Sequence, residues 1–329
     1  LSPHRYAKQN WCLSLNQTRT ELTCPLIGHW RSNNTDYKIL SKFLSEQLLP
    51  LMPNLIHIDQ SRFIPGRSTS ANIRRFFRIM ESCSTNYPYA AAIVLDLEKA
   101  FDTVDWLYLF SLLHCLDLGP TFTALTRLLY TNCWVSVHTG NLISDLIPIC
   151  RGTKQGCPLS PLVFTLAIEP LAIALRREGL QWGIPLGDGT HSISLCVNDI
   201  VLYVQDITHF HDNISTTLTE FSALSGLSVN WDKSLIFPLT VNLIPGPIDL
   251  GGGLVTWQPH TFRYLGIRIF HSDIDTLDCN IVRAINGNRG QIGFWTSLPL
   301  TTMRRIALTK MVILPHLLYY FANIPLKLP

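Results

Sequence analysis

Two short apolar runs, each with an acidic residue at one end, strongly limit what this chain can fold into. The run "AAIVL" is followed by Asp96, and the stretch "SLCVNDIVLYV" holds two apolar arms joined by Asn198 and Asp199. Runs of this length, bounded by polar residues, predict buried strands. Because Asn and Asp both tolerate turn backbone, the second stretch predicts a tight β-hairpin with Asn198-Asp199 at its apex.

An amphipathic helix is predicted in "DYKILSKFLSEQLL", where Asp36 is the expected N-cap and Pro50 the expected stop. The residues expected on its buried face are Leu40, Phe43, Leu44 and Leu48. Another helix is predicted to begin at Ser160, with Ser160 as its cap and Pro161 at the first helical position, which is a favoured arrangement. We expect this helix to kink at Pro170.

The stretch "SANIRRFFRIM" gives a cleaner helical period, with apolar residues at Ile73, Phe76, Phe77 and Met80. Because strands and helices alternate irregularly, we expect an α+β fold rather than a doubly wound parallel sheet. Hydrophobic residues make up 47% of the 329 residues and charged residues 15%, which excludes a disordered chain.

Four basic side chains cluster around the helix predicted in "SANIRRFFRIM": Arg67, Arg74, Arg75 and Arg78. Two interpretations remain open, a solvated helix face and contact with nucleic-acid phosphates. The net charge of +3 is too small to decide between them.

Cysteine spacing and hydropathy indicate the cellular location that the sequence predicts. Nine cysteines occur without C-x-x-C spacing, which predicts reduced thiols in an intracellular protein. The stretch "MVILPHLLYYFANIPL" is short for a membrane span, so no membrane association is predicted. The chain begins with Leu, which favours a fragment of a longer protein.

Asp96 and Asp199 are candidate metal ligands. Acids on neighbouring strands of one sheet can converge on a divalent cation, and Mg²⁺ prefers hard oxygen ligands, few of them from protein. Taken alone, two aspartates so far apart in the sequence are equally well explained as a cap and a turn residue.

Several ordered motifs resemble those of one family. The stretches "AAIVLDLEKAFDTVDW", "RGTKQGCPLSPLVFTLAIEPLA", "CVNDIVLYV", "LSVNWDKS" and "FRYLGI" resemble the successive reverse-transcriptase motifs of non-LTR (LINE-type) retrotransposons. The resemblance covers roughly residues 30 to 329. It implies a right-hand polymerase fold with fingers, palm and thumb and an antiparallel palm sheet. The expected boundaries are a poorly matched segment 1–35, fingers and palm in 36–270 and an incomplete helical thumb in 271–329.

The resemblance also implies roles for individual residues. Asp96 and Asp199 match metal-binding aspartates, and Phe101 matches an aromatic gate that crowds a ribose 2′-hydroxyl; a core aromatic remains the alternative. Gln155 and Gly156 match a loop that touches the incoming nucleotide. Lys233 matches a lysine near the nucleotide phosphates, and an exposed surface lysine without a role is the alternative. Arg304, Arg305 and Lys310 are weaker candidates for contact with duplex backbone.

Two positions depart from the family pattern. Asn198 stands where the family has the first of two paired acids, a direct metal ligand. Arg62 stands where the family usually has a glycine. An amide keeps one neutral oxygen donor but loses the charge, so we expect Asn198 to impair catalysis.

The resemblance implies an RNA-directed DNA polymerase. Its cofactors would be two Mg²⁺ ions, with Mn²⁺ as an alternative, and its partners an RNA template, a DNA primer and deoxynucleoside triphosphates. A second hypothesis is a catalytically inactive nucleic-acid-binding remnant of the same fold. A third is a translated remnant that does not fold stably.

Overall fold

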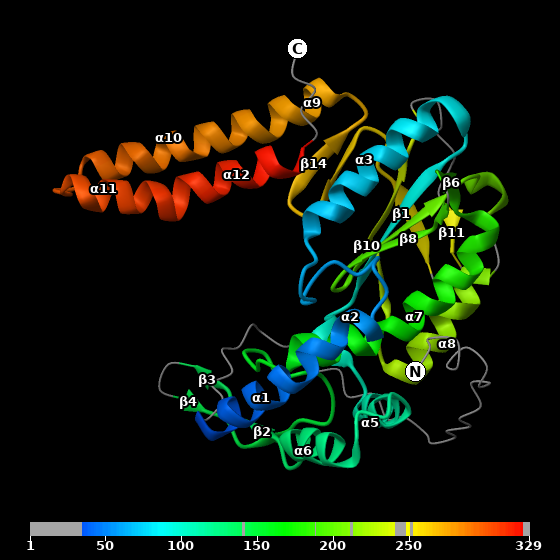
Figure 1. Ribbon diagram of the computed structural model, residues 1–329, viewed down its shortest axis with the longest axis vertical. Helices are drawn as coiled ribbons and strands as arrows, with labels where there is room; N and C mark the ends of the chain where they lie inside the picture. Colours follow the sequence, from blue (N-terminus) through cyan, green and yellow to red (C-terminus); the bar gives the residue numbers. More distant parts are fainter. Residues whose placement is uncertain are drawn as a thin grey trace.

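A computed structural model describes residues 35–139, 142–187, 189–210, 213–240, 248–250 and 253–324. Its centre is a six-stranded sheet with the strand order β11-β12-β10-β1-β9-β8 (Figure 1). The strands are β1 (Ala91–Leu97), β8 (Ile193–Cys196), β9 (Asp199–Val204), β10 (Val229–Pro238), β11 (Ile248–Asp249) and β12 (Leu254–Trp257). The segment 1–35, expected to match the family poorly, lies almost entirely outside the described residues.

Neighbouring strands of this sheet run antiparallel, except for β10 and β12, which run parallel. With helices at irregular intervals around it, the sheet confirms the predicted α+β fold. Smaller two-stranded sheets are formed by β2 (Trp134–Val135) with β5 (Ile147–Pro148), β3 (His138–Thr139) with β4 (Leu142–Ile143), β6 (Ile184–Leu186) with β7 (Gly189–His191), and β13 (Thr261–Tyr264) with β14 (Ile267–Phe270).

Helix α3 (Thr69–Asn86) forms where the sequence predicts it. Ser68 caps its N-terminus by accepting a hydrogen bond from the Ser70 backbone N–H at 3.2 Å. The four predicted apolar residues are all buried: Ile73, Phe76, Phe77 and Met80. The 3.6-residue period therefore identified the buried face of this helix correctly.

Helix α1 (Thr35–Leu48) differs from the prediction at three places. Asp36 lies in its first turn rather than at its cap, and Pro50 does not stop the chain, which continues through a 3₁₀ turn into α2 (Met52–Leu55). Proline is tolerated there because the first positions of a helix need no N–H donor. The Phe43 side chain is 53% exposed, so its assignment to the buried face was wrong.

Helix α7 (Ser160–Trp182) begins one residue earlier than predicted, with Leu159 in place of Ser160 at the cap. It continues through Pro170 and is buried along most of its length. The other helices before the β13–β14 hairpin are α4 (Ala100–Thr103), α5 (Trp106–Cys115), α6 (Pro120–Tyr130) and α8 (Asn213–Ser225), of which α6 packs against α1 and α5.

The two faces of the sheet carry separate hydrophobic cores. One core packs the sheet against α5, α7 and α8, and includes Leu95 and Ile200. The other packs it against α3 and the β13–β14 hairpin, and includes Ala92, Val201 and Tyr203. Because successive side chains of a strand alternate between the two faces, the even-numbered residues of β1 and the odd-numbered residues of β9 share the α3 face.

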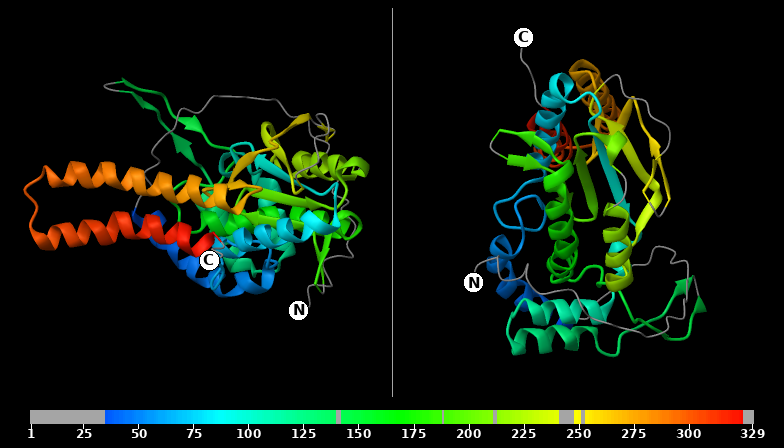
Figure 2. Two further views of the ribbon diagram at one scale, coloured as in Figure 1. Left: turned by 90° about the horizontal axis from the view of Figure 1, so that it is seen from above. Right: turned by 90° about the vertical axis from the view of Figure 1, so that its right-hand side faces the viewer.

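A long helical hairpin projects from the sheet (Figures 1 and 2). One arm runs through α9 (Asp273–Leu277), a π-helical turn (Asp278–Val282) and α10 (Arg283–Thr296). The other runs through α11 (Thr302–Leu308), a second π-helical turn (Thr309–Ile313) and α12 (Leu314–Asn323). Within the part of the chain that the structure describes, no helix has both the length and the apolar character needed to cross a bilayer.

Candidate active site

The structure brings the two predicted acids together. Asp96 lies near the end of β1 and Asp199 begins β9, and these residues are directly opposite each other on adjacent antiparallel strands. Side chains at directly opposed positions point to the same face of a sheet. Both acids therefore lie on the α3 face, at the edge where its core ends.

The turn of the β8–β9 hairpin was predicted one residue out of place. Cys196 pairs with Asp199, so the two turn residues are Val197 and Asn198, not Asn198 and Asp199. Asp199 belongs to the strand because it pairs with Asp96 on its other side. As a result Asn198 lies in the turn, and Asp199 is held on both sides by the sheet.

This turn has an unusual backbone. Val197 has φ +65°, a left-handed conformation that is rare for a β-branched residue. A residue held there costs about 1–3 kcal/mol and persists only where the surrounding structure enforces it.

Burial and charge together raise the pKa of the Asp199 carboxyl. Burial is the larger cause, and the neighbouring Asp96 carboxylate adds to it, while Arg62 acts in the opposite direction. Two carboxylates that repel each other in a partly dry site favour a cation between them. Arg62 is thus close enough to influence this edge electrostatically.

Lys233 also lies at the acid pair. Its Nζ is 4.0 Å from the Asp96 Oδ2, while its side chain is 71% exposed. The Asn230 side chain accepts a hydrogen bond from the Lys233 backbone N–H at 3.2 Å, and Asn230 lies opposite Asp96 in the β1–β10 ladder. This pairing places the lysine beside the acids although they are far apart in the sequence.

Phe101 stacks on Phe164 of α7, with ring centroids 4.3 Å apart. Its carbonyl accepts hydrogen bonds from the Thr153 backbone N–H at 2.5 Å and from the Thr153 hydroxyl at 3.1 Å. Phe101 is therefore joined to the loop that carries Gln155 and Gly156. Both loop residues are exposed, and Gly156 has φ +76°, a conformation that glycine adopts without strain.

The predicted basic cluster is divided by the fold. The Arg67 guanidinium donates to four backbone carbonyls within the chain, those of Pro53, Ile56, His57 and Gln60. Arg75 is half-buried and pairs with Asp59 at 2.7 Å. Arg74 donates to the carbonyl of Ala322 in α12, and Arg78 lies exposed on α3. A role in nucleic-acid binding stays a prediction for all four.

The segment 57–62, which we call the strap, had no predicted role apart from the departure at Arg62. It pairs with β8, the outermost strand next to the acid pair, through a parallel bridge between Gln60 and Leu195. It has no helical or strand period, and the strand that it pairs with is more than a hundred residues away in the sequence. Its one mark in the sequence was Arg62, at a position where the family usually has a glycine.

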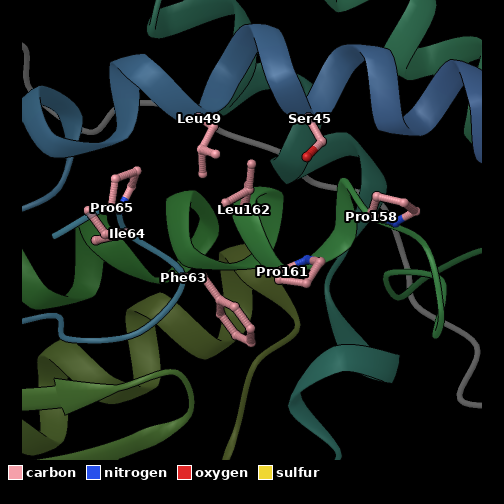
Figure 3. A pocket seen from close by; sticks show the side chains of 8 residues that line it. All are labelled: Ser45, Leu49, Phe63, Ile64, Pro65, Pro158, Pro161 and Leu162. Carbon is pink, nitrogen blue, oxygen red and sulfur yellow. The ribbon is translucent and has the colours of Figure 1, made fainter. Parts of the chain in front are cut away.

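A hollow of about 460 Å³ lies between α1, the loop after the strap and the start of α7 (Figure 3). Its lining residues are Ser45, Leu49, Phe63, Ile64, Pro65, Pro158, Pro161 and Leu162. None of them is charged, so the hollow is unsuited to binding a triphosphate.

The acid pair suits Mg²⁺ better than a metal held wholly by protein. Among the described residues, no group of three or more His, Cys, Asp or Glu side chains could hold a metal ion. Mg²⁺ is commonly bound by one or two carboxylates, with water and substrate phosphates completing its shell. Asp96 and Asp199 fit that pattern.

Comparison with known proteins supports the resemblance seen in the motifs. Transposon TX1 uncharacterized 149 kDa protein of Xenopus laevis is 30% identical over 248 residues, which are 74% of this chain and 19% of that protein. The Pol polyprotein from the type-2 retrotransposable element R2DM of Drosophila melanogaster is 24% identical, over 80% of this chain and 25% of that protein. The chain thus spans about a fifth to a quarter of these curated relatives.

Among solved structures, apo telomerase from Candida tropicalis is similar at 12% identity with a TM-score of 0.46, over 71% of this chain and 39% of that one. The family profile described as reverse transcriptase (RNA-dependent DNA polymerase) matches residues 17–269, from within the N-terminal segment to the end of the β13–β14 hairpin. With its acids paired on adjacent antiparallel strands and this match over most of its length, the chain belongs to the reverse transcriptase family.

Proposed function

We propose that this chain is the polymerase domain of a LINE-type retrotransposon and that its activity is RNA-directed DNA synthesis. One observation carries the proposal: Asp96 and Asp199, predicted as metal ligands from motifs far apart, are directly opposed on two central strands. The relatives from transposable elements support the same assignment.

Asp96 and Asp199 would hold the divalent cations, with Mg²⁺ preferred because both donors are hard oxygens. When bound, these ions activate the attacking primer hydroxyl and stabilise the leaving phosphate oxygens. Lys233, whose Nζ is 4.0 Å from the Asp96 Oδ2, is placed to donate a proton to the departing pyrophosphate or to neutralise its negative charge.

The nucleotide would bind beside Phe101 and the loop of Gln155 and Gly156. Because Phe101 is stacked on Phe164, its ring is held rigidly and can exclude a ribose 2′-hydroxyl, which favours deoxynucleotides. Gly156 allows the backbone to approach the ligand, and the exposed Gln155 amide offers hydrogen bonds to a base or sugar.

Fingers and palm would comprise residues 36–270, and the helical hairpin in 271–329 would be the thumb. The RNA template and the DNA primer would lie between these parts, against the acid pair. Arg74 and Arg78 are the exposed members of the basic cluster on α3, and Arg304, Arg305 and Lys310 lie on the hairpin.

Asn198 determines how fast we expect this chain to extend a primer. It lies in the turn beside Asp199, where the family has a charged ligand, so the site holds two carboxylates instead of three. A metal site supplies several kcal/mol of transition-state stabilisation, so we expect the chain to be at least about a hundredfold slower than the Asn198→Asp variant.

The test is primer extension on an RNA template with Mg²⁺. Asn198→Asp is expected to extend the primer efficiently and the unaltered chain weakly, while an Asn198→Asp variant that also carries Asp199→Asn is expected to be inactive. Equal rates with and without Asn198→Asp would contradict the claim that the amide is disabling. Absence of extension by every form, in a chain that melts cooperatively, would contradict the proposed polymerase activity.

The same amide favours one alternative, a nucleic-acid-binding protein without synthesis. That alternative predicts salt-dependent binding of primer–template, because basic side chains displace counterions from the phosphates. It also predicts that Asn198→Asp leaves extension undetectable.

A further inference from the structure

The turn of the β8–β9 hairpin needs an external restraint. Val197 is buried and has φ +65°, so its branched side chain opposes the conformation that the turn requires. Asp199 follows two residues later as the first residue of β9, directly after that turn. A change at Val197 would therefore be passed on first to Asp199, in addition to the restraint that strand pairing places on it.

The restraint comes from Gln60 in the strap. The Gln60 Oε1 accepts a hydrogen bond from the Val197 backbone N–H at 3.0 Å. Gln60 is completely buried, and the same oxygen also accepts from the Arg62 backbone N–H at 3.4 Å. A buried backbone N–H must find a partner, so this amide favours the strained turn over conformations that direct the N–H elsewhere.

The strap is itself tied to the hairpin by its backbone. The Ser61 N–H donates to the Leu195 carbonyl at 3.1 Å, and the Leu195 N–H donates to the Asp59 carbonyl at 3.0 Å. Asn72 of α3 donates to the same Leu195 carbonyl at 2.7 Å. Gln60 is thus held in register with the strand that leads into the turn.

Ion pairs of the partly buried Asp59 fix the strap to the rest of the fold. The Asp59 carboxylate contacts His57 at 2.8 Å, Arg75 of α3 at 2.7 Å and Arg176 of α7 at 3.3 Å. Arg67 completes this by bonding the carbonyls of His57 and Gln60. The strap is therefore a rigid support between two helices and not a free loop.

We infer that Gln60 is a positioning residue for the acid pair: its buried amide holds the strained Val197 turn so that Asp199 faces Asp96. The inference rests on the proposed function, since it takes the acid pair to be the metal site. The inference predicts that Gln60 affects metal affinity without contacting the metal, because it acts through the turn that it supports.

The first test compares Gln60→Met with the unaltered chain. Methionine keeps the length of the side chain but removes the acceptor. We expect hydrogen exchange at the Val197 amide to become about tenfold faster, as loss of one buried hydrogen bond predicts. We also expect the affinity for Mn²⁺ alone, measured by paramagnetic resonance, to fall about severalfold to tenfold.

The matched control is Thr240→Val. Thr240 is buried and donates to the Pro88 carbonyl at 2.8 Å, at the opposite end of the sheet from the acids. The control removes one buried hydrogen bond without touching the hairpin. It should change the melting temperature about as much as Gln60→Met, with no change in Mn²⁺ affinity or in Val197 exchange.

A second variant keeps the test decisive if Gln60→Met lowers stability broadly. Glycine adopts positive φ freely, so Val197→Gly removes the need for the restraint. In the Val197→Gly background, Gln60→Met should weaken Mn²⁺ binding much less than in the unaltered chain. Equal effects in both backgrounds would overturn the inference.

The two readouts separate this inference from the proposed function. Unchanged exchange at Val197 in Gln60→Met would overturn the positioning role whatever the metal does. Faster exchange with unchanged Mn²⁺ affinity would overturn it too. No Mn²⁺ binding by the unaltered chain or by Asn198→Asp would instead contradict the proposed metal site, and the exchange measurement would still decide whether Gln60 holds the turn.

Discussion

Asp199 shows at the scale of one residue how a functional group opposes stability. Burial, and then the charge of Asp96, raises the pKa of its carboxyl in the folded chain. The folded state therefore binds its proton more tightly than the unfolded state does. Stability from this group is present at acid pH and is lost as the pH rises through the raised pKa.

We therefore predict that Asp199→Asn stabilises the fold at neutral pH while it abolishes synthesis. The gain should be about 0.5–2 kcal/mol, as is common when a strained functional group is removed. Denaturant unfolding at pH 7 and pH 3 measures it, and the gain should shrink at pH 3, where the carboxyl is protonated. Asp232→Asn, an exposed acid nearby, serves as the control, and a destabilised Asp199→Asn would contradict the prediction.

At the scale of an element, the strap depends on Asp59. Burial alone would raise the pKa of this carboxyl, but the His57 hydrogen bond and the charges of Arg75 and Arg176 lower it overall. Its contribution to stability is therefore present at neutral pH and is lost as the pH falls through the lowered pKa.

We predict that Asp59→Ala costs about 3 kcal/mol, because it leaves the largely buried Arg75 guanidinium without its carboxylate and removes one of the two carboxylates that contact Arg176. Urea unfolding at pH 7 gives the free energy. Glu46→Ala is the control, since the Glu46–Lys42 pair is exposed and should contribute less than about 0.5 kcal/mol. A loss at Asp59 no larger than at Glu46 would show that the strap is not held by its ion pairs.

The helical hairpin is joined to the β13–β14 hairpin by side chains of both arms: Thr276 and Asn280 bond the backbone of β14, and Tyr319 bonds the turn. The Tyr319 hydroxyl of α12 donates to the carbonyl of Leu265, in a turn where Leu265 and Gly266 both have positive φ. Tyr319→Phe keeps the ring and removes the donor. We expect a loss of about 1 kcal/mol and faster hydrogen exchange at Leu265 and Gly266. Exchange that is unchanged in this turn would exclude Tyr319 as its anchor.

At the scale of the whole molecule, nucleic-acid binding should separate surface charge from structural charge. Arg78 is exposed, so Arg78→Gln should weaken primer–template binding and reduce the salt-dependence slope by about one, with the melting temperature unchanged. Arg67 is committed to four carbonyls, so Arg67→Gln should lower the melting temperature instead. Binding titrations over a salt series give the slope, and a thermal melt gives the melting temperature. A lower melting temperature for Arg78→Gln, with weaker binding only for Arg67→Gln, would contradict this assignment of the two arginines.

Periodicity and motif order were enough for some features. The buried face of α3 follows from apolar residues at helical spacing, and the existence of strands β1 and β9 follows from short apolar runs. Local rules were less accurate at boundaries. Phe43 satisfies the helical period of α1 yet is exposed, because the period cannot show how wide a face the neighbouring elements cover.

By itself, the sequence determined the α+β fold, the reverse transcriptase family and the identity of the two acids, because each depends on residues close together in the chain or on ordered motifs. Tertiary structure alone decided that Val197 rather than Asp199 lies in the turn, that Arg67 binds carbonyls, and that Gln60 supports the hairpin. The Gln60–Val197 hydrogen bond spans 137 residues. A contact between residues so distant forms only when the sheet and helices have assembled, so no local pattern in the sequence records it.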